Sequence, residues 1–145
     1  MVITFAATVV SAQTSRKSVS VAEVTGTFRM NFMGKFRGSY DEIKIASAGR
    51  GKLHVAMDLL YPYKLANGDD IANTGQLDDT FTISGDTATY TSGPCTMTIN
   101  FVRAGTIKVT QNGNDADCGF GHNVMADGMY HKVSSRQPRF DDNPQ

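Results

Sequence analysis

Apolar and polar residues alternate along short runs of this chain, and glycine-containing turns separate one run from the next. In residues 95–111, CTMTINFVRAGTIKVTQ, apolar side chains occupy every second position from Cys95 to Phe101, and a turn at Gly105 leads into a second run. A two-residue period places these side chains on one face of a β-strand, and two such runs joined by a glycine turn are typical of an antiparallel hairpin. The pattern therefore predicts antiparallel β structure.

Similar runs recur about every ten residues: a second hairpin turns at Gly49-Arg50-Gly51, and a weak strand is expected at 71–77 inside a polar loop. No window longer than eleven residues combines a 3.6-residue period with helix caps, so we expect little helix. Short sequential strands with one apolar face each either close into a barrel or pack as a sandwich. We expect an all-β fold, a single antiparallel up-and-down (lipocalin-like) barrel of 8–9 strands, with a flattened sandwich as the alternative.

The chain has 145 residues, which is long enough for one domain with its own core. We assign the β-barrel domain to residues 24–134, a linker or first strand to 13–23, and a polar tail to 135–145. Residues 1–12, MVITFAATVVSA, are uncharged and resemble the apolar part and cleavage site of a secretory signal peptide, an N-terminal strand being the other interpretation. A bilayer span takes about 20 apolar residues, so we expect no integral membrane segment.

The charges of the chain balance, because Lys and Arg together number 14 and Asp and Glu together also number 14. A nucleic-acid-binding domain usually has a basic excess or a basic stripe, and this sequence has neither. We therefore expect no nucleic-acid partner.

Residues 118–132, CGFGHNVMADGMYHK, place a cysteine, two histidines and an aspartate close together in the sequence. A catalytic cysteine needs a lowered pKa and an orienting third group, and nothing around Cys118 and His122 supplies them. Two cysteines in an exported chain usually form a bridge. If the hairpin brings Cys95 level with residues 112–113, the following loop can return Cys118 to it. We therefore predict a Cys95–Cys118 disulfide and no catalytic residue in this stretch.

His54 and Asp58 lie on one face of a predicted strand, opposite its aliphatic face. Two positions four residues apart on a strand are about 13 Å apart, too far to share a metal ion. The pair is a surface feature if the aliphatic face fills the barrel, and part of a ligand site with His131 if the lumen is polar. The acidic loops at 67–70 and 112–117 do not match the EF-hand ligand pattern, so we predict no metal and no cofactor.

Tyr61 and Tyr63 bracket Pro62 in the stretch LLYPYKL. Proline cannot donate a hydrogen bond in a sheet ladder, so this stretch belongs at a strand end or edge. Tyrosines at a barrel mouth offer a large contact area with a polar tip, which suits a ligand or a partner protein. Ordinary packing of a strand end explains the two tyrosines equally well.

The order of motifs after residue 93 resembles the C-terminal half of small exported bacterial β-barrel proteins of uncharacterised function. The resemblance is carried by Cys95, TMTINF, TIKVTQ, CGFG at 118–121, ADG at 126–128, Tyr130 and Lys132. The resemblance covers about residues 24–135 and implies an exported single-domain barrel with a disulfide. It assigns no catalytic residue to this chain. The general build is also similar to that of periplasmic inhibitors of lysozyme, although their distinctive sequence motifs are missing and the comparison rests on architecture alone.

These observations lead to one main functional hypothesis and two alternatives. We expect a non-enzymatic periplasmic or secreted barrel that binds a small apolar ligand in its lumen or an extracytoplasmic protein at its mouth, such as a cell-wall hydrolase that it inhibits. The alternatives are a small lumen-site enzyme that uses His54, His131 and a carboxylate, and a structural envelope protein without a discrete site. A lumen cavity above roughly 300 Å³ favours ligand binding, and a filled core favours recognition at the surface.

Overall fold

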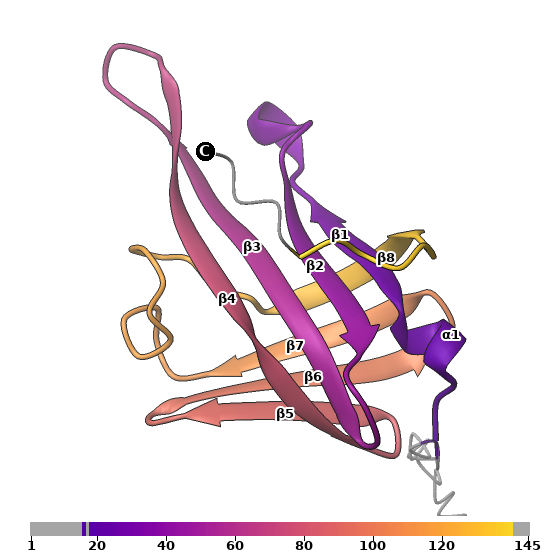
Figure 1. Cartoon of the computed structure of the whole chain (residues 1–145). Helices are drawn as coiled ribbons and strands as arrows, with labels where there is room; N and C mark the ends of the chain where they lie inside the picture. Colours follow the sequence, from indigo (N-terminus) through magenta and orange to yellow (C-terminus); the bar gives the residue numbers. More distant parts are fainter. Residues whose placement is uncertain (1–15, 17, 141–145) are drawn as a thin grey trace, which may run out of the picture.

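The computed structural model describes residue 16 and residues 18–140, so the signal-peptide-like segment 1–12 lies outside the described part. The described residues form a closed barrel of eight antiparallel strands, each paired with its neighbours in the sequence (Figure 1). The strands are β1 (Gly26–Asn31), β2 (Tyr40–Ser47), β3 (Lys52–Lys64), β4 (Asp70–Ser84), β5 (Thr87–Ser92), β6 (Cys95–Arg103), β7 (Thr106–Asn112) and β8 (Gly128–Ser134). The prediction of an all-β up-and-down barrel is confirmed.

Two short helical segments accompany the strands: the α-helix α1 (Val21–Val24) and the 3-10 helix η1 (Gly34–Phe36). The helix α1 falls at the end of the span 13–23, which was expected to be a linker or a first strand. Ser20 caps it, because the Ser20 hydroxyl accepts a hydrogen bond from the backbone N–H of Glu23. A single turn is too short to produce a recognisable 3.6-residue period, so the sequence pattern did not indicate it.

The barrel closes where β8 pairs with β1, and the register there shifts between Thr27 and Phe28. Gly26 begins β1 next to this irregularity with a φ of +149°. A β-carbon placed on Gly26 would lie 2.3 Å from the backbone oxygen of Ser134, far inside van der Waals contact. The seam of the barrel therefore requires a glycine at position 26.

The inward-facing side chains fill the barrel and form one continuous hydrophobic cluster. The largest fully buried members are Tyr130, Phe28, Phe81, Phe101, Ile43, Ile45, Met57, Leu59, Met97, Ile99, Ile107 and Val55. Their two-residue spacing within each strand is the alternation seen in the sequence. The interior of the barrel is therefore a packed core.

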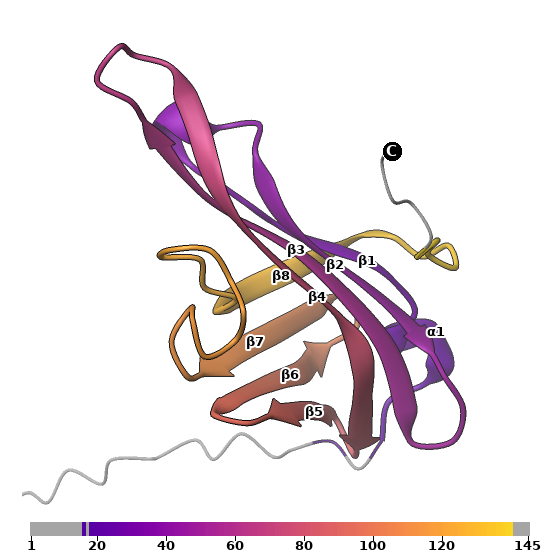
Figure 2. The same cartoon turned by 60° about the vertical axis from the view of Figure 1, so that its left-hand side comes forward.

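Different segments cover the two ends of the barrel. The helix α1 lies at one end, where Val24 joins the core (Figures 1 and 2). The loop 113–127 between β7 and β8 lies at the other end and contributes the buried side chains Phe120 and Val124. This loop rests directly on β4 at Gly75, where a β-carbon would come within 2.8 Å of both Phe120 and Val124.

The β3–β4 hairpin is longer than the rest of the barrel wall. Its two strands pair continuously from Lys52↔Thr82 to Lys64↔Asp70, whereas β2 pairs with β3 only from Glu42↔Asp58 to Ser47↔Leu53. The outer half of the hairpin therefore extends beyond the wall, at the same end as η1 (Figures 1 and 2). The weak strand expected at 71–77 belongs to this long β4. No helix within the described residues is long and apolar enough to cross a membrane.

Candidate functional site

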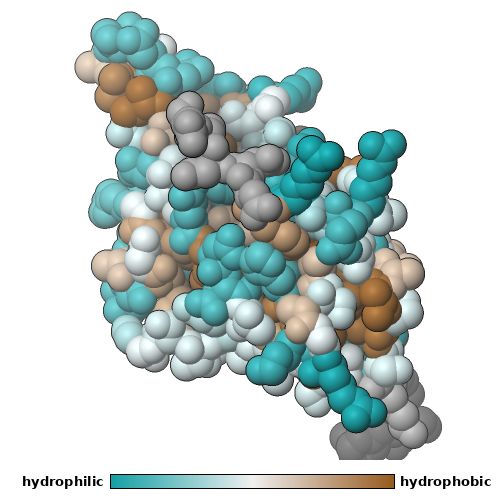
Figure 3. All heavy atoms as spheres, viewed as in Figure 1, coloured by the Kyte–Doolittle hydropathy of each residue, from teal (hydrophilic) through white to brown (hydrophobic). Residues whose placement is uncertain are grey.

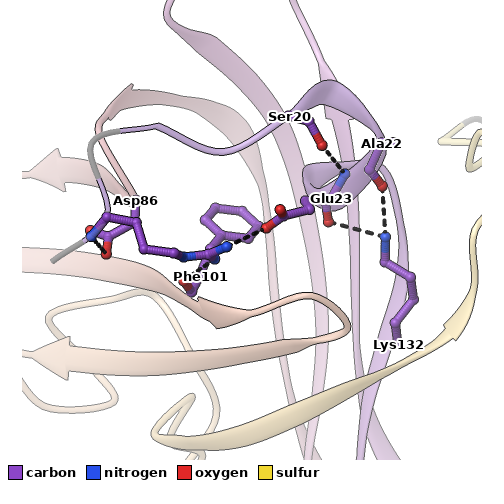
Figure 4. Close-up of polar contacts among 7 residues, drawn as sticks. Ser20, Ala22, Glu23, Asp86, Phe101 and Lys132 are labelled. Atoms are coloured by element: carbon purple, nitrogen blue, oxygen red, sulfur yellow. Dashed lines mark hydrogen bonds and ion pairs between the residues drawn. The ribbon is translucent and has the colours of Figure 1, made fainter. Parts of the chain in front are cut away.

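The α1 end of the barrel is held by a polar network around Arg16, close to Asp86 and Phe101 (Figure 4). The Arg16 backbone N–H donates to Asp86 Oδ2 at 2.8 Å, and its Nη1 pairs with Glu23 Oε2 at 2.8 Å. Its Nη2 donates to the backbone oxygen of Phe101. The hydrogen bond from the Arg16 backbone is the main cause that lowers the pKa of Asp86. The contacts with Asp86 and Phe101 tie Arg16 to the barrel, and the ion pair with Glu23 ties it to α1.

Lys132 forms a second set of structural contacts at this end of the barrel. Its Nζ donates to the backbone oxygens of Ala22, Glu23 and Thr25 at 2.9, 3.0 and 2.9 Å, as the dashed lines to Ala22 and Glu23 show in Figure 4. These oxygens lie around the end of α1, where carbonyl groups lack partners within the helix. Burial lowers the pKa of Lys132. With its donors engaged, Lys132 holds α1 on the barrel, a role that the sequence pattern did not suggest.

The structure does not bring His54, Asp58 and His131 together. His54 lies on the outer face of β3, with Nε2 at 2.5 Å from Asp78 Oδ1 and its ring stacked on Phe140 at a centroid distance of 3.8 Å. Asp58, also on that face, accepts a hydrogen bond from Gln76.

His131 faces outward on β8, where its Nδ1 lies 3.4 Å from Thr106 Oγ1. The strands β1 and β2 lie between β8 and β3, a separation of about 14 Å at the usual strand spacing. Groups that act together as general acid and base must reach one substrate, and His54 and His131 do not share a cavity.

Cys118 and His122 belong to the loop between β7 and β8, where they have structural surroundings. As predicted, Cys118 is bonded to Cys95, with a Cα–Cα distance of 5.0 Å. His122 is 82% exposed, and its Nδ1 lies 3.7 Å from Asp115 Oδ2. The backbone N–H groups of Asn123 and Ala116 donate to the Asp115 carboxylate, and these hydrogen bonds lower its pKa.

The acidic residues of this loop thus accept hydrogen bonds from backbone N–H groups of the loop itself. Asp117 likewise accepts a hydrogen bond from the backbone N–H of Asn114. Within residues 16 and 18–140, no group of three or more His, Cys, Asp or Glu residues is placed to hold a metal ion.

The exposed hydrophobic side chains concentrate at the end of the barrel that carries η1 and the projecting hairpin. Of the nine large hydrophobic side chains that are exposed in the described part of the chain, five lie there. They are Met33, Tyr40, Tyr61, Leu65 and Ile71. Tyr61 and Tyr63 lie on the same arm with ring centroids 6.5 Å apart. Figure 3 shows hydrophobic residues near the hydrophilic tip of this hairpin.

A groove of about 260 Å³ lies between η1 and the projecting hairpin. It is lined by Lys35, Phe36, Arg37, Ser39, Leu60, Pro62, Asp70, Ile71 and Ala72. Two other cavities open at the α1 end of the molecule, one of about 490 Å³ beside Lys132 and one of about 370 Å³ between Val24 and the β2–β3 turn. All three are lined by residues at the barrel ends, outside the packed lumen.

Asp41 lies where the pairing of β2 with β3 ends, and its hydrogen-bond partner Leu60 lines the groove. Its side chain is 1% exposed, and its Oδ1 accepts a hydrogen bond from the backbone N–H of Leu60 at 2.8 Å. Burial raises the pKa of Asp41 to about 6. Asp41 is not among the predicted site residues, although its two- and four-residue spacing from the inward-facing Ile43 and Ile45 is a signal that places it on the inner face.

The raised pKa of Asp41 leads to a pH-dependent prediction. Because the folded state disfavours the ionised carboxylate, stability should fall as pH rises from 4 through about 6. The Asp41→Asn variant keeps an oxygen that accepts the Leu60 N–H and removes the charge. We expect it to be more stable than the wild type at pH 7, by roughly 1–2 kcal/mol, and to approach the wild type below pH 4. Thermal unfolding between pH 4 and 7.5 measures this difference.

The control for this prediction is Asp58→Asn, which removes an exposed carboxylate from the neighbouring strand. We expect it to change stability by less than about 0.5 kcal/mol across the same pH range. A parallel pH dependence of wild type and Asp41→Asn would contradict the role assigned to Asp41.

Together these features define the class to which the molecule belongs: a closed eight-stranded up-and-down barrel with a filled interior, one disulfide-tied loop and a projecting hairpin. Comparison with known proteins adds no family, since no family model, curated protein or solved structure matches the chain. The resemblance to small exported bacterial barrels stays a prediction.

Proposed function

We propose that the protein is a non-enzymatic binding protein that recognises a partner protein through its distal surface. The distal surface comprises residues 33–40, which include η1, and residues 60–72 of the β3–β4 hairpin. One observation carries the proposal: the interior of the barrel is filled, while the exposed hydrophobic side chains gather on segments that extend beyond the wall.

A small apolar ligand inside the barrel is the less favoured form of the hypothesis. Ligand pockets usually measure roughly 300 Å³ or more and are lined by partly accessible side chains. Here the lumen-facing rings of Phe28, Phe81 and Tyr130 are each 0% exposed and pack within one cluster. A ligand would have to displace these side chains, which a close-packed interior resists.

The projecting half of the hairpin needs an explanation other than barrel stability. An isolated two-stranded ribbon is marginally stable in water and buries little surface. Nevertheless, this ribbon carries Tyr61, Leu65 and Ile71, with exposed fractions of 41, 40 and 38%. Aromatic and aliphatic side chains that remain exposed together are typical of a surface covered by a partner.

The cysteine pair and the shape of the hairpin suggest where and how the protein acts. A disulfide is typical of oxidising compartments, which supports a periplasmic or secreted protein. A narrow, convex hairpin complements a concave surface such as the open substrate cleft of an enzyme. We therefore favour an exported enzyme as the partner, with cell-wall hydrolases as the class to test first.

Removal of the two tyrosine rings should weaken binding without unfolding the barrel. We expect the Tyr61→Ala/Tyr63→Ala variant to lose at least about tenfold in affinity for the partner, since buried tyrosines often dominate interface energies. Its midpoint of thermal unfolding should stay close to that of the wild type, because both side chains lie on the projecting half of the hairpin. The measurement is inhibition of a panel of peptidoglycan hydrolases by turbidimetric lysis of cell-wall suspensions.

Met129→Ala provides the matched control, because Met129 is 39% exposed but lies on the outer wall of β8. It should inhibit as the wild type does. Absence of inhibition by the wild type across the panel would refute the hydrolase form of the proposal, and equal inhibition by the tyrosine variant would refute the distal surface.

A further inference from the structure

We propose that the groove between η1 and the β3–β4 hairpin binds an acidic, hydrophobic segment of the partner, with an apolar side chain on Phe36, Leu60 and Pro62 and a carboxylate between Lys35 and Arg37. This inference rests on the proposed function, because it names the chemistry that the distal surface recognises. It is independent of which exported enzyme supplies the segment.

The size and lining of the groove suit one side chain. Its volume of about 260 Å³ is below the range typical of drug-sized ligands, which starts at roughly 300 Å³. Phe36 comes from the β1–β2 connection, and Leu60, Pro62 and Ile71 come from the projecting hairpin. An apolar side chain placed between the two segments would therefore contact hydrophobic groups on both sides.

The charges that line the groove favour an anionic partner. Asp70, its one acidic lining residue, already pairs with Lys64, whose Nζ lies 2.5 Å from Asp70 Oδ1. Lys35 lies over the Phe36 ring at 5.1 Å, and within the described residues no carboxylate lies within ion-pair distance of Lys35 or Arg37. A guanidinium and an ammonium placed near each other bind a carboxylate through charge-assisted hydrogen bonds.

The groove is already formed in the free protein. The backbone N–H groups of Arg37 and Ser39 donate to the oxygens of Gly34 and Phe36, each at 3.1 Å, and so hold the turn that carries both cations. On the opposite side, the hydrogen bond from Leu60 to the Asp41 carboxylate positions the base of the hairpin. Preorganisation of this kind lowers the entropic cost of binding.

The test uses a peptide probe and the full-length protein. A peptide of sequence GGFDDGG and its amide analogue GGFNNGG are titrated into isotopically labelled protein, and backbone amide shifts are followed by NMR at low and high salt. We expect saturable shifts confined to residues 34–39 and 60–72 with the acidic peptide. The amide analogue should bind roughly ten- to hundredfold more weakly, and high salt should weaken the acidic peptide.

Two charge-reversal variants make the inference falsifiable. Lys35→Glu/Arg37→Glu should abolish the shifts, and Arg103→Glu/Lys108→Glu, which reverses two exposed cations elsewhere on the molecule, should retain them. Equal binding of both peptides, or shifts unaffected by Lys35→Glu/Arg37→Glu, would overturn the inference. Concentration-dependent dimerisation that the same variant removes would also overturn it, because a second copy would then be the occupant.

The hydrolase assay separates failure of the groove from failure of the proposed function. Inhibition that is lost in Tyr61→Ala/Tyr63→Ala but kept in Lys35→Glu/Arg37→Glu would leave the distal surface standing and refute the groove. Acidic-peptide binding by a protein that inhibits no hydrolase would support the groove and refute only the proposed partner class.

Discussion

Replacement of Gly26 by alanine should destabilise the barrel by about 3 kcal/mol or more, the largest effect that we expect from a single added methyl group. Two costs combine at this position. The φ of +149° is one that residues with a side chain rarely adopt, and the added carbon would lie 2.3 Å from the Ser134 backbone oxygen. Because the obstructing atom belongs to the backbone of β8, relief of the clash requires the β1–β8 seam to open.

Gly49→Ala is the matched control for this prediction. Gly49 also has a positive φ, +110°, but a β-carbon there would have no atom within 4 Å. Its cost is therefore limited to backbone strain, about 1–2 kcal/mol. Urea unfolding of both variants measures the difference, and equal losses would show that the close approach of β8 does not constrain position 26.

Removal of the disulfide should have an effect of similar size. The bond between Cys95 and Cys118 closes a loop with a sequence separation of 23, and the Cys95→Ala/Cys118→Ala variant should lose roughly 3 kcal/mol of unfolding free energy. The loop 113–127 also carries Phe120 and Val124 into the core next to Gly75 of β4. We therefore expect faster amide hydrogen exchange in this loop and in the adjacent part of β4.

His122→Ala distinguishes a structural cysteine pair from a catalytic one. The His122 side chain is 82% exposed, so its removal should change stability by less than about 0.5 kcal/mol. Titration of the native protein with a thiol reagent should find no free sulfhydryl group. Unchanged stability of the double cysteine variant, or a reactive thiol whose reactivity depends on His122, would contradict the structural role.

The two predictions also bear on the distal surface. Phe120 and Val124 contact β4 at Gly75, only three residues after Ala72, which ends the part of the distal surface that β4 contributes. Loosening of the loop should therefore reduce partner binding indirectly. Gly26 lies at the opposite end, beside α1, so a folded fraction of Gly26→Ala should retain its affinity.

Strands that bury one face in the core could be predicted from the sequence. Strand segments that extend beyond the core could not. In the β6–β7 hairpin, alternation correctly located both strands, which pair from Thr96↔Asn112 to Phe101↔Ile107. The register shifts by a bulge between Phe101 and Arg103, and no pattern of alternation indicates such a bulge. The sequence of the outer half of β4 resembles that of a polar loop, because this half extends beyond the core and has no face that must be apolar.

The same distinction applies to the candidate site. The outward orientation of His54 and Asp58 followed from alternation once the aliphatic face was assigned to the core. Their partners could not be predicted in this way, since Asp78 and Phe140, which contact His54, and Gln76, which donates to Asp58, come from other parts of the chain. Arg16 and Asp86 meet across a sequence separation of 70, and nothing in their own sequence neighbourhoods signals this contact.

The sequence by itself determined which side of each buried strand faces inward, because the two-residue period is a property of the extended backbone and acts within each strand. It also made the Cys95–Cys118 pairing foreseeable, since one hairpin separates the two residues. Only the tertiary structure decided that the barrel closes at Gly26, that side chains fill its lumen, and that η1 and the β3–β4 hairpin enclose a groove. These features depend on contacts between segments far apart in the chain and on the summed volume of the enclosed side chains, and neither quantity is encoded in any local pattern.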